Sequence, residues 1–381
     1  MLVAHPGTEL YGSDRVMLDT VAALVDRGWQ VTVAVPGEGP LTDGLRDVGA
    51  VVRSCPTAVL RKSALRPRGM VSLLRDAARS LGPTWRLLRG GRPDVVYVST
   101  VTAPLWLPLA RLARRPVVCH VHEAEVGAAR VVRTALAAPL LCARSIVANS
   151  EFSLRTLTDA IPRLARRSTV VPNPVPGPPV VSEARTELTP PVRLLFIGRL
   201  SPRKGPQVAL EALRRLRADG VDAHLDLLGA VFTGYEWFER ELRDAVRRDA
   251  LEPHVEFLGF RNDVWPSIAA SDVVLVPSVA AEPFGNTAVE AVLAARPVVA
   301  STAGGLVEAV RGYRSARSVP PDDPAALAAA VRELLDDWPT VRAGAAADAV
   351  EAADRHSPER YGERIERLLL AAVGHDREAA T

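Results

Sequence analysis

A chain of 381 residues is longer than one ordinary hydrophobic core organises, and it predicts two domains of roughly 100–200 residues each. The composition, with 48% hydrophobic and 24% charged residues, is usual for a globular protein. The net charge of +3 is divided unevenly, because residues 1–176 carry +10 and the remainder −7. A basic first half predicts an anionic neighbour, such as a membrane surface or a phosphorylated acceptor, although solvated arginines would give the same counts.

Cysteine usage and apolar runs restrict the compartment. Cys55, Cys119 and Cys142 form no close pair, which argues against a disulfide framework or a thiolate zinc site and favours a reducing compartment. The first residues, MLVAHPGTELYGS, lack the basic and apolar regions of a secretory signal. The apolar run Thr134–Ala143 is shorter than the ~18 residues that span a bilayer. We expect a cytoplasmic protein, and the basic half leaves open a peripheral position at the inner face of the plasma membrane.

Short apolar runs alternate with helical patterns in the first part of the chain. One helical pattern, Arg15–Arg27, carries apolar residues at helical spacing. Continuous apolar strands between helices are typical of parallel sheets covered on both faces. The predicted strands are Leu2–His5, Gln30–Val35, Val51–Arg53, Val95–Ser99, Val117–Val121, Ile146–Ala148 and Thr169–Val171.

A proline-rich stretch from Val175 to Pro191 then interrupts the pattern and predicts an extended linker. We therefore predict an α/β protein with two Rossmann-like doubly wound domains, residues 1–177 and 190–356. Ligands of such sheets bind at the carboxyl ends of the strands, so the site is expected in a cleft between the two domains. The predicted strands of the second domain are Arg193–Ile197, His224–Leu228, Val255–Leu258, Val273–Val276 and Pro297–Ala300.

One segment of the second domain combines phosphate-binding and sugar-binding features. After a buried strand, the loop Ser278–Pro283 contains Glu282 and leads into a helix that begins near Gly285. The residues Gly285, Asn286 and Thr287 would offer unpaired amides to a phosphate. Glu290 follows among apolar neighbours, where an ionised carboxylate needs a partner. Vicinal hydroxyls of a sugar or ribose would supply this partner, and an internal salt bridge is the alternative.

A second segment gathers cations at the end of another strand. The run LLFIGRLSPRKGP ends a strand at Gly198 and crowds Arg199, Arg203 and Lys204 into the following turn. Cations at this place suit a diphosphate whose negative charge grows as a bond breaks.

In the first domain, Cys119-His-Val-His-Glu ends a strand. His120 and His122 are two residues apart, so they share one face of an extended strand. A paired-histidine metal site and purely structural histidines are the alternatives to a role in chemistry.

In order and spacing, these segments resemble the retaining glycosyltransferase family 4, whose members have the two-domain GT-B fold. The resemblance covers most of the chain. The matching features are Gly198-Arg199 with Lys204-Gly205, Phe257-Leu258-Gly259, Pro277-Ser278, the pair Glu282 and Glu290, Pro297-Val298-Val299, Gly304-Gly305 with Glu308, and Val170-Val-Pro-Asn-Pro-Val.

The resemblance implies transfer of a sugar from a nucleotide-diphosphate sugar to a hydroxyl group, with retention of anomeric configuration. It implies that Arg199 and Lys204 hold the diphosphate and that Glu290 binds the ribose. Glu282 would contact the donor sugar, and His122 would lie near the acceptor and that sugar. The amides of Phe284, Gly285, Asn286 and Thr287 would contact the phosphates or the sugar.

The family generally needs no metal for its chemistry, and we expect no cofactor. The donor is expected to be a UDP- or GDP-sugar. The acceptor side would comprise His120, His122 and an N-terminal loop in which Gly12-Ser13 replaces the family's Gly-Gly. The turn at Arg311–Val319 lacks one glycine of the family pattern. The stretch Ser357–Val373 predicts an amphipathic helix, and in this family the last helix, here residues 357–381, crosses back onto the first domain.

Two other functions remain open: a nucleotide-sugar epimerase on the same fold, and a non-catalytic nucleotide-sugar-binding protein. The spacing of Glu282 and Glu290 favours transfer over the epimerase. A non-catalytic binding protein would be expected to lack Arg199, Lys204 or Glu290, and all three are present. The acceptor is expected to be a glycan, a lipid-linked molecule or a small molecule of cell-envelope or other glycan synthesis. No nucleic-acid partner is expected.

Overall fold

The structure, a computed structural model, describes residues 1–10, 12–60 and 67–378. Its contacts divide the chain into two compact units. The N-unit contains Met1–Pro174 and the last helix, α14 (Pro358–Glu378), and the C-unit is Val175–Ser357. Among the described helices, none combines the length and apolarity needed to cross a bilayer.

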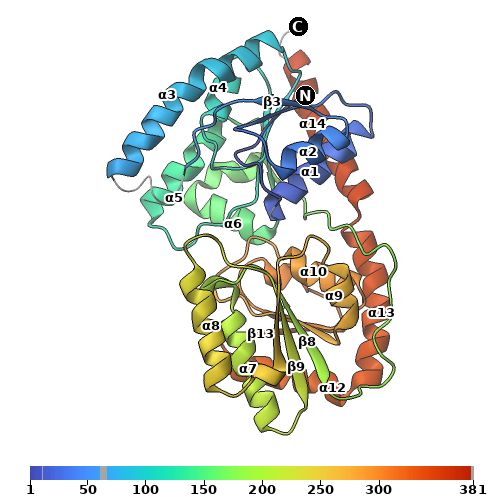
Figure 1. The fold of residues 1–381 in the computed structure, drawn as a ribbon. Coiled ribbons are helices and arrows are strands. Elements are labelled where there is room, and N and C mark those ends of the chain that lie inside the picture. Colours follow the sequence, from blue (N-terminus) through green and yellow to red (C-terminus); the bar gives the residue numbers. More distant parts are fainter. Residues whose placement is uncertain (11, 61–66, 379–381) are drawn as a thin grey trace. The chain divides into compact units, whose positions relative to one another are not determined.

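Each unit is built on one parallel sheet with helices on both faces, which confirms the α/β prediction (Figure 1). In the described part of the N-unit the strand order is β3-β2-β1-β4-β5-β6-β7. Its strands are β1 (Leu2–Ala4), β2 (Thr32–Val35), β3 (Val51–Ser54), β4 (Val96–Val98), β5 (Val117–Val121), β6 (Ser145–Ala148) and β7 (Ser168–Val170). Its helices are α1 (Gly12–Val25), α2 (Pro40–Asp47), α3 (Pro67–Gly90), α4 (Trp106–Leu112), α5 (Arg130–Ala137) and α6 (Glu151–Ala160), with α14 and the 3-10 turns Ala138–Cys142 and Pro162–Arg167.

The central strands of the N-unit are apolar on both sides because both sides are covered. Leu2 and Ala4 of β1 belong to one core cluster, and Val3 between them belongs to the cluster on the other face. Alternation along a strand produces this division. The apolar side of α14, with Ile365 and Leu369, packs in the second cluster beside α1 (Figure 1).

The C-unit sheet has the order β10-β9-β8-β11-β12-β13 in the described residues. Its strands are β8 (Val192–Ile197), β9 (Ala223–Leu228), β10 (Val255–Gly259), β11 (Val273–Val276), β12 (Val298–Ser301) and β13 (Ala316–Val319). Its helices are α7 (Pro206–Ala218), α8 (Glu236–Arg248), α9 (Trp265–Ala270), α10 (Asn286–Leu293), α11 (Leu306–Ala309), α12 (Pro324–Asp336) and α13 (Trp338–Arg355), with the 3-10 turns η4 (Pro202–Lys204) and η5 (Glu252–His254).

Strand β13 was missed by the sequence analysis, which treated Arg311–Val319 only as a turn. The strand lies at the edge of the sheet and pairs only with β12 among the described strands. Its sequence, Ala-Arg-Ser-Val, is buried only at Val319. A short, half-exposed edge strand lacks the apolar run that identified the central strands.

The proline-rich stretch has no regular secondary structure, as expected, but it is fastened to the C-unit along its second half. Arg185 forms an ion pair with Asp272, and its Nε donates to Oδ1 at 2.8 Å. The indole nitrogen of Trp338 donates to the Arg185 carbonyl at 2.8 Å. The guanidinium of Arg342 donates to the Ala184 carbonyl at 2.9 Å. This part of the linker is therefore a component of the C-unit.

A buried arginine completes this attachment. Arg296 is 2% exposed, and its guanidinium donates to the carbonyls of Ser182, Ser271 and Ala269 at 2.7, 2.9 and 2.6 Å. These carbonyls come from the linker, from the residue that follows α9 and from the end of α9 itself. One side chain thus attaches the linker to the end of α9 and satisfies the buried Ser271 carbonyl.

We expect Arg296→Leu to lower the free energy of unfolding by about 3 kcal/mol, because it leaves the buried Ser271 carbonyl without this donor and breaks the attachment of the linker to α9. Urea unfolding followed by circular dichroism measures this. Arg332→Leu is the matched control, since the half-exposed Arg332–Asp219 ion pair should contribute about 1 kcal/mol or less. Equal losses in the two variants would contradict the structural role of Arg296.

Candidate functional site

The site residues of the C-unit lie on two loops at the carboxyl edge of its sheet. One loop follows β8 and contains Arg199 and Lys204, and the other follows β11 and contains Glu282. Because β8 and β11 are paired neighbours, their following loops start side by side. Residues 78 positions apart in the sequence, Lys204 and Glu282, are thereby brought together.

Backbone contacts hold the two loops against each other. The carbonyl of Arg203 accepts hydrogen bonds from the amides of Val279 and Ala280 at 2.8 and 3.2 Å. Gly205 has a left-handed backbone with φ of 77°, and a Cβ atom there would lie 2.0 Å from the Pro277 carbonyl oxygen. Only glycine therefore fits at this crossing.

Lys204 and Glu282, predicted to bind the diphosphate and the donor sugar, form an ion pair with each other. The Lys204 Nζ donates to Glu282 Oε2 at 2.9 Å, and the Ser278 hydroxyl donates to Oε1 at 3.2 Å. An Arg203 guanidinium nitrogen lies 3.7 Å from Oε1. Glu282 is only 8% exposed, so these partners offset the cost of burying its charge.

The helix that was predicted to begin near Gly285 is α10, with Gly285 as its N-cap. Asn286 and Thr287 form its first turn, and Glu290 lies half-buried in its second. The side chain of Phe284 is 4% exposed and packs in the core, so only its backbone is available to contact a ligand. The amides at this helix start have the geometry and the partial positive charge that anions favour.

Arg199 is exposed at the end of β8, and its guanidinium lies 3.2 Å above the centroid of the Phe232 ring. Phe232 belongs to the loop between β9 and α8, at the same edge of the sheet. The sequence analysis did not single out Phe232. A cation–π contact of this kind orients a guanidinium without neutralising it.

In the N-unit, His120 of β5 and His122, which follows the end of that strand, lie side by side, as the two-residue spacing predicts. Their ring centroids are 3.9 Å apart. The Tyr97 hydroxyl lies 2.5 Å from His120 Nδ1, which places His120 inside the sheet's core. Burial, aided by the nearby His5 and opposed by Asp14, lowers the pKa of His122 from 6.5 to about 3. The His122 imidazole is therefore uncharged at neutral pH.

A second histidine cluster was missed by the sequence analysis. His5 follows β1, Ser99 follows β4, and Asp14 lies in the first turn of α1. The Ser99 Oγ lies 2.6 Å from His5 Nδ1, and His5 Nε2 lies 2.9 Å from Asp14 Oδ1. In the tautomer that satisfies both contacts, Ser99 donates to Nδ1 and Nε2–H donates to Asp14. Checking the last residue of every predicted strand would have found His5 and Ser99.

The predicted acceptor-side loop is corrected by the structure. Gly12 and Ser13 open helix α1 and do not lie in a loop. Neither residue has a positive φ, so serine replaces glycine here without backbone strain. A helix start is favoured by Asp14, whose carboxylate lies near the positive end of the helix dipole.

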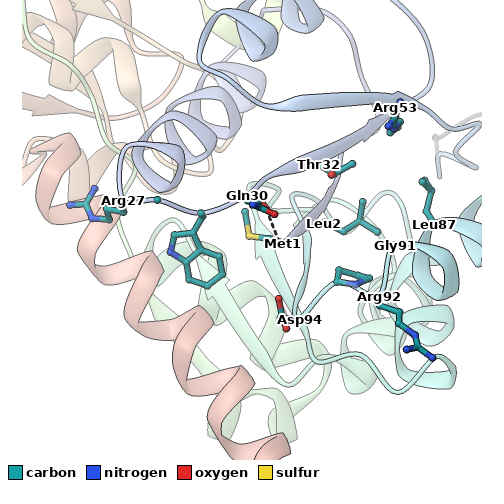
Figure 2. A pocket seen from close by; sticks show the side chains of 13 residues that line it. Met1, Leu2, Arg27, Gln30, Thr32, Arg53, Leu87, Gly91, Arg92 and Asp94 are labelled. Carbon is teal, nitrogen blue, oxygen red and sulfur yellow. Dashed lines mark hydrogen bonds between the residues drawn. The ribbon is translucent and has the colours of Figure 1, made fainter.

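A cavity of about 620 Å³ lies at the opposite edge of the N-unit sheet (Figure 2). It is lined by residues at the starts of strands, including Leu2 and Thr32, and by Arg53, Arg92 and Asp94. None of the candidate catalytic or binding residues named in the sequence analysis is among the described residues that line this cavity. The candidate catalytic and binding residues lie instead at the carboxyl edges of the two sheets.

Family models match both halves of the chain. The model described as glycosyltransferase family 4 matches residues 11–177, and the model described as glycosyl transferases group 1 matches residues 191–337. The glycogen synthase of Mycobacterium tuberculosis is 33% identical over 261 residues, which are 65% of this chain and 62% of that protein. A D-inositol 3-phosphate glycosyltransferase of Geodermatophilus obscurus is 36% identical over 222 residues, 52% of this chain and 47% of that protein. The matches thus span less than two thirds of these relatives.

Solved structures share the fold over nearly the whole chain. HepE of Anabaena, crystallised with UDP, has a TM-score of 0.80 at 22% identity, covering 97% of this chain and 99% of HepE. Sucrose-phosphate synthase of Thermosynechococcus elongatus has a TM-score of 0.73 at 18% identity over all of both chains. The predicted GT-B fold is confirmed by these likenesses.

The depressed pKa of His122 predicts a pH dependence of stability. In the unfolded chain His122 has a pKa near 6.5, whereas in the folded protein its pKa is about 3. Unfolding therefore takes up a proton, and the free energy of unfolding falls as the pH drops below 6.5. His122 alone should make this free energy about 2 kcal/mol smaller at pH 5 than at pH 7.

Urea unfolding of the wild type and of His122→Gln at both pH values measures this contribution. The glutamine variant should lose about 2 kcal/mol of the difference between pH 7 and pH 5. An unchanged difference in the variant would show that folded His122 is already protonated at pH 5.

Proposed function

Because the chain belongs to glycosyltransferase family 4 and has the GT-B fold, we propose that it transfers a sugar from a nucleotide-diphosphate sugar to a hydroxyl group. The observation that carries the proposal is the assembly at the carboxyl edge of the C-unit sheet. Arg199, Lys204 and Glu282 gather there beside the amino end of α10. These groups suit a diphosphate attached to a sugar better than they suit either ligand alone.

In the proposed reaction, the bond between the anomeric carbon and the diphosphate oxygen breaks, and the acceptor oxygen bonds to that carbon. The acceptor's proton leaves with the nucleoside diphosphate. Arg199 and Lys204 stabilise the charge that develops on this leaving group, together with the first amides of α10. We propose retention of configuration as well, which rests on the family alone.

Glu282 and Lys204 have a shared role in this proposal. Their ion pair fixes both side chains before the donor arrives, so little ordering remains to be done on binding. A diphosphate oxygen would share the lysine, while the carboxylate accepts a hydrogen bond from a sugar hydroxyl. Glu290 would bind the ribose hydroxyls. His122, being uncharged, would contribute hydrogen bonds on the acceptor side and no charge.

We propose a UDP-sugar as the donor, ahead of a GDP-sugar. The support is the structural likeness to HepE, which was crystallised with UDP and with UDP-glucose. The proposed reaction needs no metal ion.

A lipid-linked acceptor is supported by helix α3. Its side chains Met70, Val71, Leu74 and Leu81 are between 44% and 67% exposed, and exposed arginines, including Arg75, flank them. Apolar side chains beside arginines on an exposed helix are typical of an amphipathic helix that lies on an anionic membrane. We therefore propose a peripheral membrane contact through α3.

The donor proposal predicts that UDP raises the melting temperature of the wild type and that Glu290→Ala weakens this response. Losing hydrogen bonds to a charged group should reduce the affinity for UDP by about tenfold to a hundredfold. Differential scanning fluorimetry over a range of UDP and GDP concentrations measures both effects.

Glu333→Ala, on the exposed side of α12, is the control and should bind UDP as the wild type does. Absence of a response to every nucleotide would remove the donor proposal. An unaffected Glu290→Ala would remove the ribose-binding role.

The membrane proposal predicts that the wild type sediments with vesicles of phosphatidylglycerol more than with vesicles of phosphatidylcholine at low salt. Val71→Glu combined with Leu74→Glu should abolish the difference, because the new charges oppose insertion and repel anionic lipid. Val350→Glu makes the same change at an exposed valine of the C-unit and should bind as the wild type does. Equal binding to both kinds of vesicle would contradict the proposal.

A further inference from the structure

Three possible metal ligands converge on one face of the C-unit sheet, away from the donor residues. His224 and Asp226 are two residues apart on β9, so both side chains point to the same face. Glu256 lies directly opposite Asp226 in the register of the edge strand β10. Leu225 and Leu227 of β9 point to the other face, where they are buried in the core with α7 and α8.

The ligand atoms of these three side chains are close enough for one ion. His224 Nε2 lies 3.2 Å from Asp226 Oδ1, and the three ligand atoms all lie within 4.8 Å of one another. Two ligands that each lie ~2.1 Å from a metal are at most about 4.2 Å apart. The His224 and Asp226 side chains are 28% and 30% exposed, so small rotamer changes can close this gap.

The charges on this face favour a cation. Like charges directly opposite each other on neighbouring strands destabilise a sheet. Arg193 lies opposite His224 on β8 and supplies one positive charge against two carboxylates. A net negative charge therefore remains beside the imidazole.

We propose that His224, Asp226 and Glu256 bind a divalent transition-metal ion of the zinc type, with water in the remaining coordination positions. One imidazole with two carboxylates suits such an ion better than Mg²⁺ or Ca²⁺, which prefer oxygen ligands alone. The ion would clamp the edge strand β10 to β9. The site lies within the strands β9 and β10, whereas the donor residues follow the ends of β8 and β11. It is a structural site, and its existence does not depend on the proposed transferase activity.

The test is isothermal titration calorimetry of the full chain, freed of metal with a chelator, against ZnCl₂ and separately against MgCl₂. We expect one saturable Zn²⁺ site and no comparable Mg²⁺ binding. His224→Ala and Glu256→Gln should each weaken Zn²⁺ binding by about tenfold or more. Zn²⁺ should also raise the melting temperature of the wild type more than that of either variant.

His254→Ala is the matched control, because His254 precedes β10 but does not belong to the cluster. It should bind Zn²⁺ as the wild type does. No saturable Zn²⁺ binding, equal affinity in His224→Ala, an equal loss in His254→Ala or comparable Mg²⁺ binding would each overturn the proposal. Circular dichroism shows whether the variants are folded, and the response of the same samples to UDP separates failure of the metal site from failure of the donor site.

Discussion

The backbone contact between the loops that follow β8 and β11 is the constraint on which the C-unit site depends. Gly205 passes so close to the Pro277 carbonyl that no other residue fits, and the Arg203 carbonyl accepts two amides of the opposite loop. This contact determines where Lys204 and Glu282 meet. Because the geometry is set by backbone atoms, the ion pair is positioned before any ligand binds, and the energy of donor binding need not be spent on ordering these loops.

Charge is distributed differently at the two carboxyl edges. At the C-unit edge, Arg203 and Lys204 lie beside one buried carboxylate, Glu282, and a further cation, Arg199, is exposed at the end of β8. The N-unit edge contains histidines whose contacts keep them inside the fold, and burial makes His122 an uncharged group. The first arrangement suits an anion with a developing charge, and the second suits hydroxyl groups that need directed hydrogen bonds. The proposed roles, donor binding by the C-unit and acceptor binding by the N-unit, match this electrostatic difference.

Buried polar contacts far from these edges serve the fold. Arg296 joins the linker to the end of α9 through carbonyl oxygens, and Arg185 joins the linker to Asp272. The linker was predicted from its prolines, which indicate an extended backbone but not which residues of the C-unit hold it. That attachment depends on arginines and a tryptophan as many as 158 residues away in the chain, so no local pattern reveals it.

The sequence by itself determined the parallel sheets, the helix after Gly285 and the shared face of His120 and His122, because strand alternation and strand-end chemistry are local properties. It could not identify β13, an edge strand with a single buried residue. It also placed Gly12 and Ser13 in a loop, whereas they open α1. Only the tertiary structure decided that Lys204 pairs with Glu282, and that His5 joins Ser99 to Asp14. Such contacts follow from which strands are neighbours, and that order is settled by packing of the whole unit.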